Sequence, residues 1–499
     1  MKHKMTFCRS WNMWSEVNPF LNGPFEPLTR EYEEDAPIVE GKIPRELSGV
    51  LYRTGNSQFF QPLNADRAHW FDGDGMTHAF FLDEGSVRYA CKWVGTEGLM
   101  VEQKAGRALY NGLYGVSNVS QGELPPGAPP IKTVAGINVI ALAGKVLALH
   151  ELGNHYWELD PDTLETKGTF DFGGRFGDRL LTGHPHVDPS TGETLFIAQD
   201  VRAGMLTCFA VDQAGAVQSE HSVKMDSRAW IHDFIFSDDW FIFFLSPLIN
   251  NVAEESVVAQ GKGVLSLDTS AGTRIFLVNR RDGSTITIRQ EKDFQITHFL
   301  NAYQEDDEIV VDACISDLLE TGSVPPIGEV FPFPFPHVTA PVFGFPRMVR
   351  TIIDTRNRRS AQMAFEGVEG EFLRLNEAVS GKKHRFGYLA AVDPERSGQG
   401  FNCLAKFDFA TGNMQLQGIE ESYSMIPGEP IFVPHPSPDS EDHGWLFSVW
   451  WNPTRNSSEL IILDAREFDG EPVARIRISN RIPLAFHGNW IPRSRIGAA

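Results

Sequence analysis

Short apolar segments separated by turns run along most of the chain, and they predict strands rather than helices. The segments are rich in β-branched and aromatic residues, which favour strands. Helix-length amphipathic stretches are scarce. We therefore expect an all-β fold, with strands within residues 49–53, 139–149, 195–198, 240–245, 308–312, 444–450 and 459–463.

A turn pattern recurs between these segments: an apolar residue, then Asp or Asn, then turn-forming residues. The pattern occurs at 159–163, 187–192, 211–215, 278–283, 407–412 and 463–466. An Asp side chain starts such a turn by accepting backbone N–H bonds, and a later Gly supplies positive φ. The recurrence favours a β-propeller, whose blades are four-stranded sheets. An irregular sandwich or barrel built from ordinary hairpins is the alternative.

Two proline-rich segments interrupt the pattern. Residues 324–346 contain the Phe-Pro repeat 331–336, which cannot form a helix or a central strand, and residues 117–130 contain two Pro-Pro pairs. We interpret both as loops that cover an apolar cavity. Nothing else indicates a linker, so we expect a single domain over 1–499, with an N-terminal arm at 1–40 and a cap formed by inserted loops at about 105–131 and 320–347.

Composition and charge exclude several classes of protein. Hydrophobic residues make up 42% of the 499 residues and 36 are Phe, which excludes disordered, collagen-like and coiled-coil proteins. The formal charge of −21 comes without a basic cluster, which excludes nucleic-acid binding. Five dispersed cysteines favour a reducing cytoplasm. The longest strongly apolar run, 240–245, is too short to cross a bilayer and the N-terminus lacks a signal-like apolar region, so a soluble protein is expected.

Four histidines stand out because apolar or aromatic residues flank them: His184, His232, His298 and His487. Their wide separations place them in different sheets, and inner strands of separate blades would bring them to one axis. Neutral imidazoles there could bind a divalent metal, and they suit Fe, Zn, Cu and Ni alike. For each histidine alone, a packed core or turn residue is the alternative.

These contexts, together with Trp70-Phe-Asp-Gly-Asp-Gly-Met76, residues 159–166, His384-Arg-Phe-Gly-Tyr388 and Glu429-Pro-Ile-Phe-Val-Pro434, resemble the carotenoid cleavage oxygenase family from about residue 18 to 492. The resemblance implies a seven-bladed β-propeller with long loops forming a cap over an axial Fe(II). The implied iron ligands are His184, His232, His298 and His487.

The resemblance also implies three glutamates behind the ligands. Glu151, Glu371 and Glu429 would accept the distal N–H of His232, His298 and His487 respectively, which fixes each imidazole's tautomer. O2 would be the co-substrate, and no organic cofactor is implied. Both oxygen atoms would enter across a conjugated double bond and give two carbonyl products.

The substrate class is divided within the family between apocarotenoid-like polyenes and phenylpropanoid alkenes such as stilbenes, isoeugenol and vinylphenols. Lignostilbene and isoeugenol members carry a Lys immediately before the first of these glutamates, where it holds the phenolate; this chain has His150 there. A Tyr that assists the Lys aligns only roughly, near Tyr110 or Tyr114. Residues 102–114 resemble apocarotenoid-cleaving members, whereas the repeat at 331–336 resembles a loop of phenylpropanoid cleavers. We expect an apocarotenoid-like substrate, with phenylpropanoid cleavage as the alternative; a non-cleaving isomerase or binding propeller and a metal-dependent hydrolase are further alternatives.

Substrate-contacting residues follow from the same resemblance. Ile137 stands where most members carry a Thr near the open iron position. His150 and Tyr114 are two further residues that we expect to contact the substrate. Apolar polyenes enter bilayers, so peripheral contact of the Phe-Pro loop with a membrane is a further hypothesis. No pattern indicates an oligomeric state. The expected aromatic wall comprises Phe59, Phe60, Phe299, Phe331, Phe333, Phe335, Phe343 and Phe345.

Overall fold

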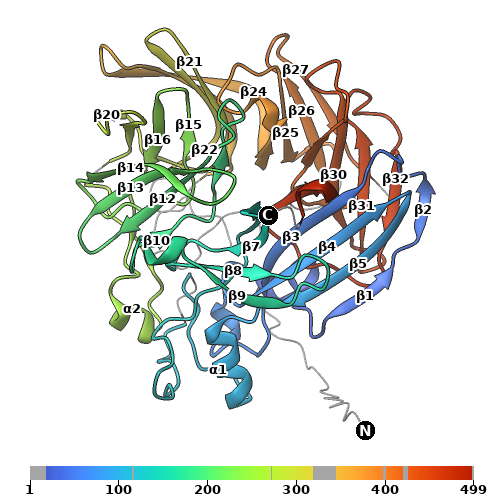
Figure 1. Cartoon of the computed structure of the whole chain (residues 1–499), viewed down its shortest axis with the longest axis horizontal. Helices are drawn as coiled ribbons and strands as arrows, with labels where there is room; N and C mark the ends of the chain where they lie inside the picture. The colour runs from blue at the N-terminus through green and yellow to red at the C-terminus, as the bar shows by residue number, and fades with distance from the viewer. Residues whose placement is uncertain are drawn as a thin grey trace.

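The β-sheets surround a common axis (Figure 1). They form seven blades of four to six strands, because the seven-stranded sheet β21–β27 makes two blades that share β24, and a separate two-stranded hairpin is attached to one blade. The computed structural model describes residues 18–114, 117–270, 272–318, 344–396, 400–419 and 425–496. Blade 1 has the strand order β1-β5-β4-β3-β33, with β1 (Tyr32–Asp35), β3 (Gly49–Ser57), β4 (Asp74–Asp83), β5 (Ser86–Trp93) and β33 (Gly488–Pro492).

Blades 2 and 3 are antiparallel sheets of consecutive strands. Blade 2 contains β6 (Asn138–Leu142), β7 (Lys145–Leu149), β8 (Tyr156–Leu159) and β9 (Thr166–Phe170). Blade 3 contains β10 (Leu180–Leu181), β11 (His186–Val187), β12 (Thr194–Asp200), β13 (Met205–Val211) and β14 (Val217–Lys224).

Blade 4 carries an additional hairpin. Its sheet contains β15 (Ile235–Phe236), β16 (Trp240–Leu245), β19 (Arg274–Asn279) and β20 (Thr285–Arg289), and the hairpin pairs β17 (Leu248–Asn250) with β18 (Leu265–Leu267).

Blades 5 and 6 share one long strand, β24 (Arg359–Arg374). Residues 359–369 of β24 pair with β23 of blade 5, and residues 370–374 pair with β25 of blade 6. The other strands are β21 (Phe294–Glu305), β22 (Glu308–Asp317) and β23 (Arg347–Asp354) in blade 5, and β25 (Phe386–Ala391), β26 (Cys403–Asp408) and β27 (Asn413–Gln417) in blade 6.

Strands from both ends of the chain close the ring. Blade 7 contains β28 (Ile426–Pro427), β29 (Ile431–Pro434), β30 (Gly444–Asn452), β31 (Ser457–Asp464) and β32 (Ala474–Arg477), and β2 (Ile38–Gly41) pairs with β32. In return, β33 pairs with β3 of blade 1. The end of the expected N-terminal arm, residues 32–40, therefore contributes strands to blades 1 and 7.

A hydrophobic cluster fills each junction between neighbouring blades, so the core forms a closed ring of seven parts. Each buried large apolar side chain contributes about 1.5–3 kcal/mol to folding. Residues of neighbouring blades that share one cluster include, for successive junctions, Val50 and Trp157, Leu147 and Phe196, Leu206 and Phe243, Ile275 and Ile309, Leu300 and Leu389, Tyr388 and Trp450, and Phe447 and Phe80.

The recurring Asp and Asn turns form as predicted. In each, the side-chain oxygen accepts the backbone N–H two residues later, at 2.9 or 3.0 Å. The expectation of one strand over 139–149 was wrong, because Ala143 and Gly144 adopt φ of +53° and +71° and reverse the chain between β6 and β7. This turn conformation matches the right-handed twist of an antiparallel hairpin.

Helices are few. The described residues contain α1 (Glu97–Ala105) and α2 (Glu255–Ala259), and neither is long and apolar enough to span a membrane. Short 3₁₀ helices lie at Pro19–Leu21, Gly23–Phe25, Ala65–Arg67, Phe172–Gly174, Glu377–Val379 and Arg493–Arg495.

The segment that follows α1 packs beside the α2 region, at the bottom of the view in Figure 1. The backbone of Val264 donates to the carbonyl of Leu113 at 2.7 Å, and that of Asn118 donates to Gly261 at 3.1 Å. These contacts join the segment predicted as a cap, 105–131, to the insertion of blade 4. Most of the other predicted cap segment, 320–347, lies outside the described residues.

Candidate metal centre

The four selected histidines lie together where four blades meet the axis. His184 stands between β10 and β11, His232 precedes β15, His298 belongs to β21 and His487 precedes β33. All four are buried, and their candidate ligand atoms lie within 4.8 Å of one another. Blades 3, 4, 5 and 1 thus contribute one histidine each.

The Nε2 atoms face a common centre. Nε2 of His232 lies 3.1 Å from Nε2 of His184 and 3.2 Å from Nε2 of His298. Nε2 of His298 lies 3.0 Å from Nε2 of His487. Nitrogens at about 2.1 Å from one ion and at right angles to each other would be about 3.0 Å apart. The observed separations fit such an arrangement.

Three buried carboxylates hold the opposite ring nitrogens. His232 Nδ1 donates to Glu151 at 2.5 Å, and His298 Nδ1 donates to Glu371 at 2.6 Å. His487 Nδ1 donates to Glu429 at 2.8 Å. Glu151 follows β7, Glu371 lies in β24 and Glu429 lies between β28 and β29, so the remaining blades, 2, 6 and 7, supply the carboxylates.

The donor set suits a divalent metal. A carboxylate at Nδ1 fixes the tautomer in which Nε2 carries a lone pair, and such lone pairs repel one another at about 3 Å unless a cation lies between them. Burial lowers the pKa of His184, and the neighbouring histidines lower it further. Burial also lowers the pKa of His487, whereas at His298 the Glu371 carboxylate outweighs burial and raises the pKa. Neutral nitrogens backed by three carboxylates compensate a double positive charge.

Aromatic side chains surround the histidines. The ring of Phe372 lies 5.8 Å from that of His298 and 5.7 Å from that of His487, and the indole of Trp230 lies 5.1 Å from His232. Phe372 has φ of +58°, which is unusual for a residue with a side chain, and strained backbone of this kind recurs at functional sites. Phe372 and Trp230 were not predicted as site residues, because no local pattern distinguishes them from packed aromatic residues.

Ile137 and Tyr114 lie beside the centre. A Cβ atom placed on Gly183 would be 2.6 Å from Cγ2 of Ile137, so the Ile137 side chain covers the residue before His184. The Tyr114 hydroxyl donates to Oε1 of Glu151, the carboxylate that holds His232. Asp72 accepts the backbone N–H of Tyr114 at 2.9 Å and thereby anchors this segment.

Three other predicted substrate contacts, His150, Phe299 and Phe59, pack against residues other than the four histidines. The His150 ring contacts Trp157, and its Nε2 bonds to the carbonyl of His155 at 2.8 Å. Phe299 packs on Phe244 in the core between blades 4 and 5. Phe59 packs on Phe60 and Trp93.

The remaining predicted wall residues are divided by their position. Phe345 contacts Phe401, which in turn contacts Phe372, so it belongs to the aromatic cluster around the centre. Phe331, Phe333, Phe335 and Phe343 lie outside the described residues.

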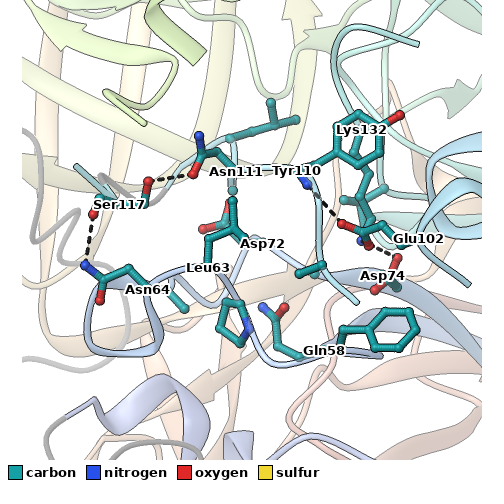
Figure 2. Close-up of a pocket in the computed structure, with 18 of the residues that line it drawn as sticks. Gln58, Leu63, Asn64, Asp72, Asp74, Glu102, Tyr110, Asn111, Ser117 and Lys132 are labelled. Carbon is teal, nitrogen blue, oxygen red and sulfur yellow. Dashed lines mark hydrogen bonds and ion pairs between the residues drawn. The ribbon is translucent and has the colours of Figure 1, made fainter. Parts of the chain in front are cut away.

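A separate polar pocket lies beside the segment that contains Tyr114 (Figure 2). Its lining includes Asp72 and Leu113 but none of the four histidines. Lys132 reaches Asp74 at 2.6 Å and Glu102 at 2.7 Å. Burial alone would lower the pKa of Lys132, but the two carboxylates raise it. This charged cluster links the base of the 105–131 segment to blade 1.

Comparisons with known proteins identify the family and agree with the fold. Residues 25–492 match the family described as retinal pigment epithelial membrane protein. Isoeugenol monooxygenase of Pseudomonas putida is 30% identical over 95% of this chain and 98% of its own. Apocarotenoid-15,15'-oxygenase of Synechocystis sp. is 28% identical over 93% of this chain and 95% of its own.

A solved structure of cobalt-substituted Synechocystis ACO superimposes with a TM-score of 0.79 at 26% identity, covering 93% of this chain and 97% of that one. The family match spans nearly the whole propeller, including all seven residues at the centre. The chain therefore belongs to the retinal pigment epithelial membrane protein family of carotenoid cleavage oxygenases.

Proposed function

We propose that this protein is a non-haem Fe(II) dioxygenase that cleaves a conjugated C=C bond of an apocarotenoid-like substrate. One O2 is consumed for each double bond, and each carbon of that bond takes one oxygen atom. The two products are carbonyl compounds, and no external reductant is required. The observation that carries the proposal is the convergence of four buried Nε2 atoms, three of them on imidazoles held by carboxylates.

In this proposal His184, His232, His298 and His487 hold the iron, and Glu151, Glu371 and Glu429 fix the last three imidazoles. Iron, when bound there, supplies the activation of O2 toward an electron-rich alkene. The donor set supports iron but suits other divalent metals too, so the choice of iron rests on family membership.

The rest of the chain orients the alkene and excludes water. Phe372, Trp230 and Tyr114 are buried beside the histidines and offer flat apolar surfaces to a conjugated substrate. Ile137 keeps the space next to His184 apolar. Such a setting keeps water away from the reacting double bond.

An apocarotenoid-like substrate is supported by the lack of a cation before Glu151. The residue there is His150, and burial lowers its pKa to about 3, so it is neutral at pH 7 and cannot pair with a phenolate. Isoeugenol and apocarotenoid oxygenases match this chain at similar identity, which keeps phenylpropanoid cleavage as the second candidate.

We also propose a single catalytic domain over residues 1–499, with 105–131 and 320–347 forming a cap. The contacts of Leu113 and Asn118 with the blade 4 insertion support this role for the first segment. A cytoplasmic location and peripheral contact of the Phe-Pro loop with membranes complete the proposal. Flotation with phosphatidylcholine vesicles tests that contact, and protein that stays entirely at the bottom of the gradient contradicts it.

The test of the function is product analysis with the Fe(II)-loaded protein, an apocarotenal, resveratrol and isoeugenol under ¹⁸O₂. The carbonyl products are reduced at once, so that exchange with water does not remove the label. We expect two labelled fragments from the apocarotenal and none from a His298→Ala control prepared in parallel.

Other results would support one of the alternative functions. Cleavage of only the phenolic alkenes would retain the reaction and change the substrate class. A single product of unchanged mass would identify an isomerase, and turnover without O2 would identify a hydrolase; either result would overturn the proposed reaction.

A further inference from the structure

A buried carboxylate next to the metal centre contacts none of the four imidazoles. Asp233 follows His232 in the chain, and its side chain is only 4% exposed. Oδ1 accepts from Nε2 of His186 at 3.0 Å and from the backbone N–H of Phe234 at 2.8 Å. Oδ2 accepts the backbone N–H of Phe299 at 3.2 Å. Four hydrogen-bonding groups thus meet in one buried place.

The partners of Asp233 come from three neighbouring blades. His186 begins β11 of blade 3, two residues after His184. Phe299 follows His298 in β21 of blade 5, and Asp233 itself leads into β15 of blade 4. One carboxylate therefore bonds to each of three segments that carry a candidate ligand.

The backbone of β21 is shaped for this contact. The pairing of β21 with β22 shifts register between Ile296 and Phe299 and again between Phe299 and Asn301. Such an irregularity leaves a backbone group outside the strand ladder, and an unpaired buried N–H is unfavourable. Asp233 supplies the acceptor that this N–H needs.

We propose that Asp233 is a positioning residue, which sets the mutual placement of His184, His232 and His298 by joining the three blades behind them. It differs from Glu151 and Glu371, which orient imidazole rings directly. Its effect travels through the backbone next to each ligand, so its loss would widen or skew the centre without removing a ligand. This inference rests on the proposed metal-binding function.

The test is Co(II) binding to the metal-free protein, because the visible absorption of Co(II) reports coordination geometry as well as affinity. In Asp233→Asn the new amide cannot accept from both His186 and the Phe299 N–H. We expect Co(II) affinity to fall by about 10–100-fold, the range for loss of a group that supports metal ligands, and the absorption band to shift.

Asp188→Asn is the matched control. Asp188 is also buried and also bridges blades 3 and 4, through Arg280 at 2.7 Å. It follows β11 in the chain, but its side chain bonds to Arg280 and to the backbone N–H of Ser190, and not to the backbone beside His232 or His298. We expect this variant to lose thermal stability and to keep the Co(II) affinity and spectrum of the wild type. Equal loss of affinity in both variants would overturn the proposal, because a general loosening of the blades would then explain it.

His186→Ala keeps the test decisive if Asp233→Asn does not fold, because the His186 side chain is partly exposed at 23%. We expect Co(II) affinity to fall by about 3–10-fold, less than in Asp233→Asn, because Asp233 keeps its bond to the Phe299 N–H. Unchanged affinity and spectrum in the folded variants would overturn the role of Asp233. A wild-type protein that binds neither Co(II) nor Fe(II) would instead refute the metal-binding function itself.

Discussion

Replacement of Glu429 by Gln tests the electrostatic support of the metal centre, because Gln keeps the shape of the side chain and removes its charge. Glu429 is buried, and Oε1 accepts from His487 while Oε2 accepts the backbone N–H of Gly488 at 3.0 Å. Arg374 lies 3.4 Å from the same carboxylate. The Gln amide would face one of these donors with a donor of its own.

The pKa of Glu429 sets how much stability its charge contributes. Burial alone would raise this pKa, but His487, Arg374 and Arg53 outweigh burial and lower it from 4.5 to about 2. A difference of about 2.5 pKa units corresponds to about 3 kcal/mol of stability, and to less where His487 is neutral. Because the folded-state pKa is the lower one, this stabilisation is complete above pH 4.5 and is lost as the pH falls towards 2.

We therefore expect Glu429→Gln to lower the free energy of unfolding of the metal-free protein at pH 7 by at most about 3 kcal/mol, because the low pKa of His487 leaves its imidazole neutral and Arg374 and Arg53 as the cationic partners. Loss of the carboxylate behind His487 should also weaken Co(II) binding by about 10–100-fold. Denaturant unfolding and Co(II) titration measure the two effects.

Glu377→Gln serves as the control, since Glu377 contacts the same Arg374 at 2.6 Å but is 58% exposed. An exposed pair contributes about 0–1 kcal/mol, and this variant should bind Co(II) as the wild type does. If the two variants lose equally little stability and affinity, the buried carboxylate does not support the centre and the reasoning fails.

Three other changes probe the scaffold and the wall of the site. Burial, with a smaller effect of Arg53, lowers the pKa of His78 to about 3. As the pH falls below 6.5, His78 is therefore protonated in the unfolded chain but not in the folded one, which destabilises the fold. His78→Gln should reduce the loss of unfolding free energy between pH 7 and 5 by about 2 kcal/mol, and an unchanged pH dependence would contradict this. In Gly75→Ala the new Cβ would lie 2.2 Å from the carbonyl oxygen of Ala135, so the free energy of denaturant unfolding should fall by about 3 kcal/mol or more. In the control Gly168→Ala the new Cβ has no atom within 4 Å, and the unfolding free energy should change by less than about 0.5 kcal/mol. Tyr114→Phe removes the donor to Glu151 and should cost about 1–3 kcal/mol in the same assay; wild-type stability would refute the importance of that hydrogen bond.

Much of the fold could be read from local chemistry. The Asp and Asn turns predicted the strand ends because their side-chain bonds are local, and they favoured the propeller. The number of blades came from family resemblance. Two features were hidden because they depend on long-range pairing: the division of β24 between two blades, and the closure of blades 1 and 7 by β33 and β2.

The site, too, could be predicted only in part from the sequence. The apolar contexts of the four histidines identified the residues that the structure brings together. His150 and Phe299 are chain neighbours of Glu151 and His298. Because successive side chains of an extended segment point to opposite sides, these two pack on Trp157 and Phe244 instead. Asp233 had no distinguishing pattern, since an Asp after a His resembles an ordinary solvated residue until three blades enclose it.

Anaerobic reconstitution with Fe(II), followed by iron analysis and X-ray absorption at the iron edge, tests the central claim most directly. The account predicts one iron for each chain, with four histidine nitrogens as its protein ligands, and a large loss of iron from a His298→Ala, His487→Ala double variant that remains folded. Failure of the wild-type chain to bind iron, or equal binding by the double variant, would contradict the four-histidine centre and with it the proposed reaction.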